Sequence, residues 1–174
     1  MKVEQKEQLY EGKAKKVFAT SDPDLVIVSY KDDATAFNGL KKGTIVGKGV
    51  INNRMSNYLM GLLAKEGIET HLVEELSDSD TLVKHVEIVP IEVIMRNVVA
   101  GSLSKRTGLP EGAIPSKPVL ELYYKSDELG DPMINADHAL AFGWATEAEL
   151  EQIEIMARKI NDILKDFFAG VGVD

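Results

Sequence analysis

The feature that most constrains the fold is a long amphipathic helix predicted near the C-terminal end of the sequence. Thr146 followed by Glu149 forms a capping box, which marks the start of a helix. Behind it, apolar residues recur at helical spacing and form one stripe over about five turns. The stripe consists of Leu150, Ile153, Met156, Ala157, Ile160, Ile163, Leu164 and Phe167. A stripe of this width belongs to a hydrophobic core, and Gly170 is predicted to end the helix.

Most of the chain before this helix is strand-like. Residues 17–19 and 25–30 are β-branched, aromatic or small, and a Ser-Asp-Pro-Asp turn separates them, so together they predict a hairpin. Further strands are predicted at 70–76, within 78–102 and at 119–125, and helices at 50–65 and, briefly, 102–106. Residues 32–49, rich in Gly, Lys and Asp, are predicted to form a long loop. Strands followed by helices, without strict alternation, favour an α+β fold with a largely antiparallel sheet.

The composition limits the classes of partner. Of 174 residues, 44% are hydrophobic, which is enough to build a core. Lys and Arg number 20 against 28 Asp and Glu, and the resulting charge of −8 disfavours a nucleic-acid partner. No apolar stretch approaches the roughly 20 residues that span a bilayer, so no membrane partner is expected. The N-terminal region has no hydrophobic signal core and the sequence has no cysteine, which together favour a cytoplasmic location.

A glycine and three lysines open the predicted hairpin, in the sequence YEGKAKKV at 10–17. Alternate residues of a strand point the same way, so Lys13 and Lys15 would share one face about 6.6 Å apart. Two ammonium groups at that separation suit a polyphosphate. The alternative is a solvated, lysine-rich edge strand, since lysine also protects sheet edges from aggregation. The segment matches neither the P-loop pattern nor a complete Gly-x-Gly-x-x-Gly, so both interpretations remain open.

A second candidate site lies in the sequence VPIEVIMRNVVAGS at 89–102, where charged residues interrupt an apolar strand. Strand alternation places Ile91, Val93 and Met95 on a core face, and Glu92 and Arg96 on the opposite face. The Ala-Gly-Ser that follows opens a short helix, whose free backbone N–H groups would join the Arg96 guanidinium in a phosphate cradle. The alternative is a structural ion pair between Arg96 and a carboxylate elsewhere, because an unpaired buried charge is costly.

The acidic segment at 125–138 is a weaker candidate. Its carboxylates do not have the spacing of an EF-hand, and the histidines His71, His85 and His138 are not spaced as zinc ligands. We therefore predict no metal site within this chain and interpret the segment as a solvated turn. Lys125 is the exception, because it ends a predicted strand and could reach inward.

Together these segments resemble the phosphoribosylaminoimidazole-succinocarboxamide synthase (SAICAR synthetase) family. The family pattern aliphatic-Pro-x-Glu-two aliphatics-x-Arg-x-x-x-Ala-Gly-Ser is met by VPIEVIMRNVVAGS. The LYEGKAKKVF opening, the DPxIN segment with its following histidine, and the FGW segment match in the same order. The likeness runs from about Leu9 to the C-terminus of the sequence.

The resemblance implies a two-lobed α+β fold related to the ATP-grasp enzymes. Residues 1–87 would form an antiparallel lobe that roofs an ATP site, and residues 88–174 a second lobe that is incomplete at its C-terminus. The implied activity is an ATP-dependent carbon–nitrogen ligase of de novo purine biosynthesis. It would condense carboxyaminoimidazole ribonucleotide (CAIR) with L-aspartate through an acyl phosphate, giving SAICAR, ADP and phosphate. ATP and Mg²⁺ would be the cofactors, and the protein would be a cytoplasmic homodimer.

The resemblance also assigns residues. Those expected at ATP are Lys13, Ala14, Lys15, Val17, Val26, Val83, Lys84, Val86, Ile88 and Lys125, with 84–88 as a hinge beside the adenine. Those expected at the ribonucleotide are Arg96, Ala100, Gly101 and Ser102. The loop predicted at 32–49 would border the substrate.

One departure from the family pattern affects the catalytic residues. The family continues into a strand with Asp-x-Lys-x-Glu-Phe-Gly, whereas this sequence ends at Asp174, so the main catalytic and magnesium-binding candidates are expected beyond it. A non-catalytic nucleotide-binding fragment is therefore an alternative. A small-molecule kinase is another, although the His-Arg-Asp and Asp-Phe-Gly motifs of protein kinases are absent.

Overall fold

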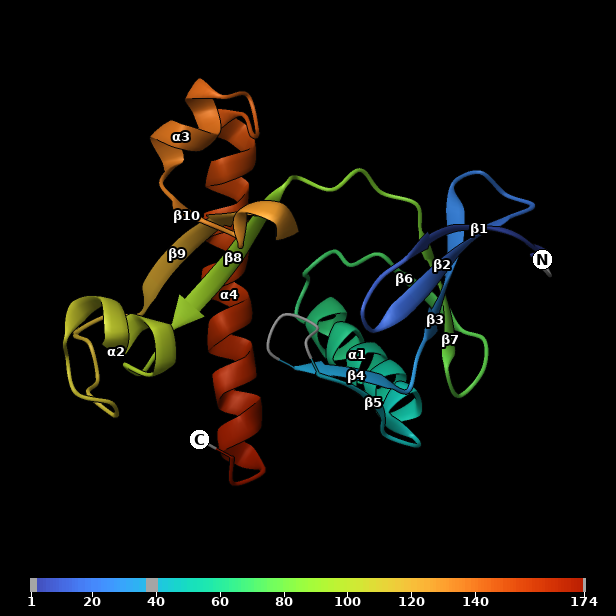
Figure 1. Ribbon diagram of the computed structural model, residues 1–174, viewed down its shortest axis with the longest axis horizontal. Helices are drawn as coiled ribbons and strands as arrows, with labels where there is room; N and C mark the ends of the chain where they lie inside the picture. The colour runs from blue at the N-terminus through green and yellow to red at the C-terminus, as the bar shows by residue number, and fades with distance from the viewer. Residues whose placement is uncertain (1–2, 37–40, 174) are drawn as a thin grey trace. The chain divides into compact units, whose positions relative to one another are not determined.

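The computed structural model describes residues 3–36 and 41–173. The chain divides into two compact units, Met1–Glu87 and Ile88–Asp174, and each is described by itself. Both combine antiparallel strands with helices, which confirms the predicted α+β class (Figure 1). Within the described parts of the chain, no helix has both the length and the apolar character needed to cross a bilayer.

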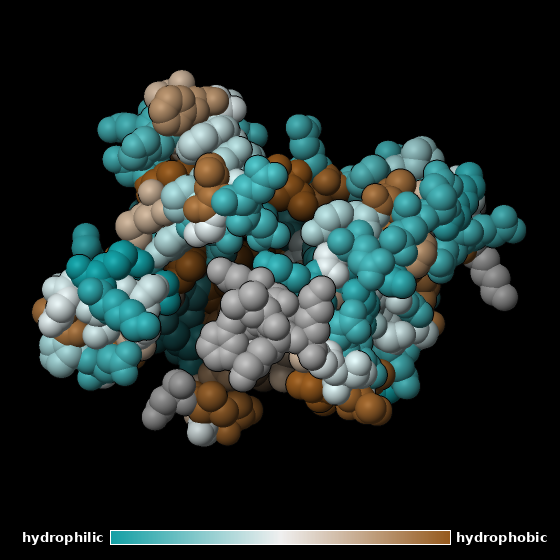
Figure 2. Space-filling model, viewed as in Figure 1, coloured by the Kyte–Doolittle hydropathy of each residue, from teal (hydrophilic) through white to brown (hydrophobic). Residues whose placement is uncertain are grey.

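Unit 1 is built on a five-stranded antiparallel sheet with the order β1-β2-β3-β7-β6. Its strands are β1 (Gln5–Glu11), β2 (Lys15–Thr20), β3 (Leu25–Tyr30), β6 (Leu72–Glu75) and β7 (Asp80–Lys84). The predicted hairpin is confirmed as β2 and β3. Strand β1 was not predicted, because most of its residues are polar; all of them are exposed, as expected of an edge strand. Figure 2 shows this side of unit 1 as predominantly hydrophilic.

The prediction of a long loop at 32–49 was wrong for the residues that the structure describes; residues 37–40 of this segment lie outside them. Strands β4 (Asp33–Ala36) and β5 (Lys41–Thr44) pair with each other within this segment, and helix α1 (Lys48–Lys65) begins before its end. Neither short strand has the apolar alternation from which strands are predicted; their backbone groups are satisfied by pairing with each other.

Helix α1 occupies the predicted position, and its start is held by Asp32. The Asp32 carboxylate accepts hydrogen bonds from the N–H groups of Gly47, at 3.1 Å, and Gly49, at 2.8 Å. A negative charge at this end of a helix also interacts favourably with the helix dipole. Gly49 lies so close to strand β3 that a Cβ there would be 2.7 Å from the carbonyl oxygen of Tyr30, so only glycine fits without a backbone shift.

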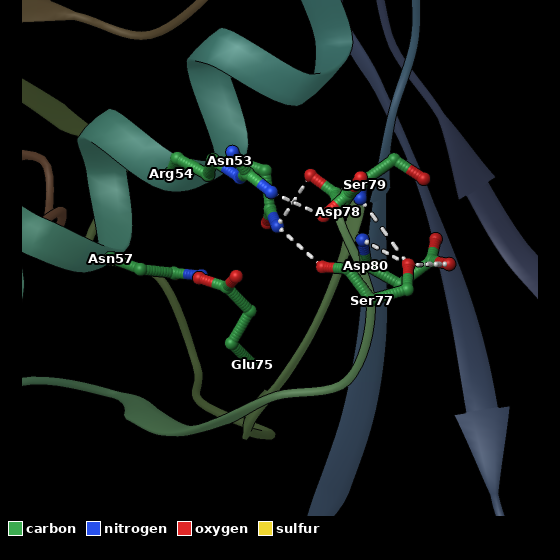
Figure 3. A network of polar contacts seen from close by, with 8 residues as sticks. All are labelled: Asn53, Arg54, Asn57, Glu75, Ser77, Asp78, Ser79 and Asp80. Carbon is green, nitrogen blue, oxygen red and sulfur yellow. Dashed lines mark hydrogen bonds and ion pairs between the residues drawn. The ribbon is translucent and has the colours of Figure 1, made fainter.

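The buried side of α1 is polar at its centre. Asn53 is fully buried, whereas the apolar residues Ile51, Met55 and Tyr58 are 64%, 49% and 60% exposed. The Asn53 amide nitrogen donates to the carbonyl oxygens of Ser77 and Asp78, each at 3.1 Å, while its oxygen accepts from Thr81 at 2.6 Å. Figure 3 shows Asn53 pointing from the helix into the turn between β6 and β7. This network attaches α1 to the sheet by hydrogen bonds in addition to apolar packing.

Unit 2 contains a three-stranded antiparallel sheet with the order β10-β9-β8. Its strands are β8 (Ile91–Arg96), β9 (Val119–Tyr124) and β10 (Met133–Ile134); its helical elements are α2 (Gly101–Thr107), η1 (Asp127–Leu129), α3 (Ala136–Ala141) and α4 (Glu147–Gly170). The capping box at the start of α4 is confirmed, with the Glu149 N–H donating to the Thr146 hydroxyl and the Thr146 N–H to the Glu149 carboxylate.

Helix α4 packs along β8, on the face predicted to belong to the core. Buried Ile91 packs with Val93, and Leu150 of α4 lies against the same cluster. Farther along the helix, a groove of about 890 Å³ separates the two elements. It is lined mainly by apolar side chains, among them Val93 and Met95 of β8 and Met156, Ile160, Leu164 and Phe168 of α4. The opposite face of the β8–β9 pair carries the polar residues of the second candidate site.

Candidate functional site

The glycine-lysine segment forms a tight connection between β1 and β2. The Gly12 N–H donates to the Lys15 carbonyl oxygen at 2.9 Å, and the Lys31 N–H donates to the Ala14 carbonyl oxygen at 2.8 Å. Strand β2 begins only at Lys15, so Lys13 lies in the connection. The argument that Lys13 and Lys15 alternate along one strand was therefore wrong, although both side chains are exposed.

Lys31, a half-buried lysine, stabilises the chain next to this connection through two ion pairs. The Lys31 ammonium lies 2.6 Å from both a Glu11 carboxylate oxygen at the end of β1 and an Asp33 carboxylate oxygen at the start of β4. The Lys31 side chain is 19% exposed, and the hydrogen bonds to Asp33 and then Glu11 raise its pKa above the ordinary value. The ion pairs tie the end of β1 to the start of β4 beside the connection, in which the Lys13 and Lys15 side chains are exposed.

Next to the connection, valines of three strands form an apolar cluster. Val26 and Val83 are buried cross-strand partners, and Val28 joins them. Val17 packs against this cluster and is the cross-strand partner of Val28. The structure thus brings together the three valines predicted at the adenine, although their contact with a nucleotide stays a prediction.

The predicted hinge at 84–88 follows this sheet. Lys84 ends β7 and pairs with Leu25, and the His85 N–H donates to the Asp24 carbonyl oxygen at 2.7 Å. Residues 86–90 form neither helix nor strand, and Val86 and Ile88 are 52% and 69% exposed. The segment therefore carries exposed apolar side chains where the chain passes from unit 1 into unit 2.

In unit 2, Arg96 is held by two partners. Its Nε donates to a Glu121 carboxylate oxygen at 3.1 Å, and its Nη2 donates to the Ser102 hydroxyl at 3.1 Å. The ion pair that was the structural alternative for Arg96 is therefore present. The same arginine also lies beside Ser102, as the cradle interpretation predicted. Glu92 shares this face but is exposed.

Three residues of this arrangement were missed from the sequence: Arg106, Glu121 and Tyr123. Arg106 of α2 donates to the second oxygen of Glu121 and, at 2.8 Å, to the Tyr123 hydroxyl, which itself donates to Glu121 at 2.8 Å. A signal for two of them was present. In VLELYY, Glu121 and Tyr123 alternate with apolar residues, which places both on the non-core face of β9.

In the cluster of Arg96, Arg106, Glu121 and Tyr123, the electrostatic interactions favour the charged forms of Glu121 and Arg96. Burial acts to raise the pKa of Glu121, but the hydrogen bonds from Tyr123 and Arg96 and the charges of both arginines outweigh it, so the pKa lies below its ordinary value. For Arg96, burial acts to lower the pKa, and the interactions with Glu121 and the nearby Tyr123 outweigh that effect and raise it. One carboxylate is thus shared by two guanidinium groups, and the three groups together carry a net positive charge.

The start of α2 differs from the prediction. The Gly101 N–H, expected to be free for a phosphate, donates to a Glu111 carboxylate oxygen at 3.1 Å. Gly101 itself has a positive φ of 52°, a conformation that favours glycine, which accounts for glycine between Ala100 and Ser102.

The acidic segment contributes local structure. The Asp131 carboxylate accepts from the Ser126 N–H at 2.9 Å, and Asn135 and His138 form the capping box of α3. Lys125 follows β9, is exposed, and its N–H donates to the Pro90 carbonyl oxygen at 3.0 Å. Among the residues that the structure describes, no group of three acidic or histidine side chains is placed to hold a metal ion.

These features of the two units define a class of protein. Exposed lysines beside an apolar sheet face in one α+β unit, and paired arginines with hydroxyl groups in the other, are typical of proteins that bind phosphorylated small molecules. The comparisons give the family. Residues 8–174 match the family model described as SAICAR synthetase.

Named relatives agree with the family model. The chain is 60% identical over 168 residues to the phosphoribosylaminoimidazole-succinocarboxamide synthase of Lachnoclostridium phytofermentans, covering 97% of this chain and 72% of that protein. It is 56% identical over 168 residues to the enzyme of the same name from Magnetococcus marinus, covering 97% and 69%.

Solved structures agree as well. The phosphoribosylaminoimidazole-succinocarboxamide synthase of Ehrlichia chaffeensis superimposes with a TM-score of 0.92 at 48% identity, covering 95% of this chain and 70% of that one. A SAICAR synthetase solved in complex with ADP gives a TM-score of 0.89 at 48% identity, covering 94% and 69%. The chain belongs to the SAICAR synthetase family.

Proposed function

We propose that this protein condenses CAIR with L-aspartate at the expense of ATP, giving SAICAR, ADP and phosphate in de novo purine biosynthesis. The observation that carries the proposal is the 60% identity to a named synthase over 97% of the chain. The clustering of Arg96 with Ser102, both within the matched motif, supports it.

On the nucleotide side, we assign most of the ATP contacts to unit 1. Lys13, Ala14 and Lys15 would hold the phosphates. The Lys31–Glu11 ion pair stabilises the chain next to the connection that they form, and the side chains of Lys13 and Lys15 are exposed. The adenine would rest on Val17, Val26 and Val83. The edge of the base would be bound by Lys84, Val86 and Ile88, and Lys125 is proposed as a further residue of the ATP set. A related synthetase was solved with ADP, which supports use of an adenine nucleotide.

On the substrate side, we assign the ribonucleotide phosphate to Arg96 and Ser102. A guanidinium with neighbouring hydroxyl donors matches the oxygens of a phosphate, and such charge-assisted hydrogen bonds are stronger than neutral ones. Ala100 and Gly101 would allow the ligand to approach the backbone at the start of α2.

The reaction does not require a covalent bond between the protein and a substrate. A carboxylate resists attack by an amine, so a CAIR carboxylate oxygen first attacks the γ-phosphorus of ATP and ADP leaves. The aspartate amine then attacks the acyl carbon, the C–N bond forms, phosphate leaves, and the amine loses a proton. The lysines and arginines bind and orient the anionic groups, and they stabilise charge as it moves.

Magnesium, location and assembly complete the proposal. Mg²⁺ would accompany ATP, as in most phosphoryl transfers. The described residues form no acidic cluster that would hold the ion, so no step is assigned to a magnesium site of this chain. We further propose a cytoplasmic homodimer.

The test is phosphate release from ATP by the purified protein, with CAIR and aspartate omitted in turn. The proposal predicts release only when both are present, together with a product that has the mass of SAICAR. Release that needs no aspartate but a hydroxyl acceptor would indicate a kinase. Binding of ADP without any turnover would indicate a non-catalytic nucleotide-binding protein.

A further inference from the structure

A buried carboxylate stands at the centre of the unit 2 site, and the resemblance assigns it no role. The Glu121 side chain is only 4% exposed, although it lies on the polar face of the β8–β9 pair. Placing a carboxylate there costs free energy unless charged or hydrogen-bonding partners compensate. Its partners are Arg96, Arg106 and Tyr123, and between them they use both of its oxygens.

These partners come from separate elements. Arg96 ends β8, Arg106 belongs to α2, and Tyr123 lies two residues beyond Glu121 on β9. Each arginine is also bound at a second point, Arg96 by the Ser102 hydroxyl and Arg106 by the Tyr123 hydroxyl. The two guanidinium groups are therefore oriented through one shared carboxylate rather than by independent contacts.

The arrangement leaves positive charge toward solvent. The arginine side chains are 24% and 35% exposed, whereas the carboxylate between them is almost completely buried. Two guanidinium groups would repel each other without Glu121, and with it they stay close together. One buried negative charge thus supports two partly exposed positive charges, which matches a ligand with more than one negative charge, such as a phosphate monoester.

We propose that Glu121 is a positioning residue for the ribonucleotide phosphate, holding Arg96 and Arg106 together so that both charges act on it. This inference rests on the proposed function and extends it, because Arg106 becomes a second phosphate-binding arginine. Tyr123 supports the same arrangement by its hydrogen bonds to Glu121 and Arg106. Glu121 itself acts through the arginines.

The test compares CAIR with its riboside, which lacks the phosphate, by isothermal titration calorimetry on the full chain. Glu121→Gln keeps the shape of the side chain but removes its charge, and it should weaken CAIR binding by about ten-fold or more, the effect of losing a charge-assisted bond. Binding of the riboside and of ADP should change less than about two-fold on the same scale. Glu151→Gln, an exposed charge removal on α4, is the matched control.

Equal loss of CAIR and riboside binding would overturn the inference, since a merely structural defect would affect both ligands. Unchanged CAIR binding would overturn it too. In an Arg96→Ala, Arg106→Ala background, Glu121→Gln should have no further effect on CAIR affinity, and an undiminished effect there would contradict the proposed route through the arginines.

A milder substitution in the same cluster serves as a control for effects on folding. If Glu121→Gln does not fold, Tyr123→Phe removes two hydrogen bonds of the cluster and keeps the charges. Tyr123→Phe should weaken CAIR binding about two- to ten-fold and leave riboside binding unchanged, which is the effect of losing hydrogen bonds to a neutral or a charged partner. If CAIR binding does not fall relative to riboside binding, the inference is overturned. If wild-type protein binds CAIR but makes no SAICAR, the proposed function fails while these binding results still decide the role of Glu121.

Discussion

At the scale of single residues, Arg96 makes both of the protein contacts that its sequence context allowed, an ion pair with a carboxylate and a hydrogen bond to Ser102, while its binding of a phosphate stays a prediction. Strand alternation predicted its face, and the motif predicted its proximity to Ser102, 3.1 Å away. Its carboxylate partner could not be predicted, because Glu121 is 25 residues distant in sequence and meets Arg96 only through the pairing of β8 with β9. Arg106 lies on the following helix α2, and no local pattern assigned it to the site. The pairing of Arg96 with Ser102 was thus predictable from local pattern, whereas the contacts of Glu121 and Arg106 that hold Arg96 in place were not.

Arg96→Ala should weaken CAIR binding by at least about 1.5–3 kcal/mol, the range for a hydrogen bond to a charged group. Calorimetric titration of CAIR measures it, and Arg158→Ala, which removes an exposed arginine paired with Glu154 on α4, is the control. If the variant instead unfolds, or if its folded form binds CAIR normally, Arg96 serves only the ion pair.

Lys13→Ala should raise the KM for ATP and leave the melting temperature nearly unchanged. The side chain is exposed and lies in the connection before β2, so its removal disturbs no core contact. Lys6→Ala on the exposed strand β1 is the matched control and should alter neither quantity. A large fall in melting temperature for Lys13→Ala would show that its role is structural.

The low pKa of Glu121 predicts a pH dependence of stability. A carboxyl group whose pKa is lower in the folded than in the unfolded state contributes stability above its unfolded pKa, near 4.3, and that contribution is lost as pH falls through the folded pKa. The difference in unfolding free energy between wild type and Glu121→Gln should therefore be constant from about pH 6 to 8 and shrink below about pH 4. Urea unfolding at several pH values measures it. A difference that does not vary with pH would contradict the prediction.

At the scale of elements, the two long helices were predicted well, whereas the short helix α3 and the polar strands were not predicted. The capping box and apolar stripe located α4, and apolar spacing located α1, because both signals are local. Strands β1, β4 and β5 have no such signal; they exist because a neighbouring strand satisfies their backbone groups. Spacing also could not show that α1 faces the sheet with Asn53, since that depends on the carbonyl groups of a turn 24 residues away.

Asn53→Ala should destabilise the protein by about 1–3 kcal/mol, because it leaves the buried Thr81 hydroxyl and two turn carbonyl groups without this partner. Urea unfolding of unit 1 reports the loss, for example through the fluorescence of a probe attached to this unit. Asn52→Ala, one residue earlier on α1 and half-buried, is the control and should cost less. Equal costs would mean that the network in Figure 3 adds little to stability.

At the scale of the whole molecule, each unit contains one of the two candidate sites. The basic connection and valine cluster belong to unit 1, and the arginine cluster belongs to unit 2. The ligase reaction requires two separate binding sites, because ATP and the CAIR carboxylate that it activates are bound by different residues before they react. The sequence motifs located the lysine segment and the Arg96–Ser102 pair, since each is encoded within a short segment, while the ligands of both clusters stay a prediction.

The central claim is that this chain activates the CAIR carboxylate as an acyl phosphate, and an isotope experiment tests it most directly. CAIR labelled with ¹⁸O in its carboxylate is incubated with the protein, ATP and aspartate, and the released phosphate is examined by mass spectrometry. If the carboxylate oxygen attacks ATP, each turnover transfers one ¹⁸O to phosphate. Phosphate that carries no ¹⁸O while SAICAR forms would contradict the account.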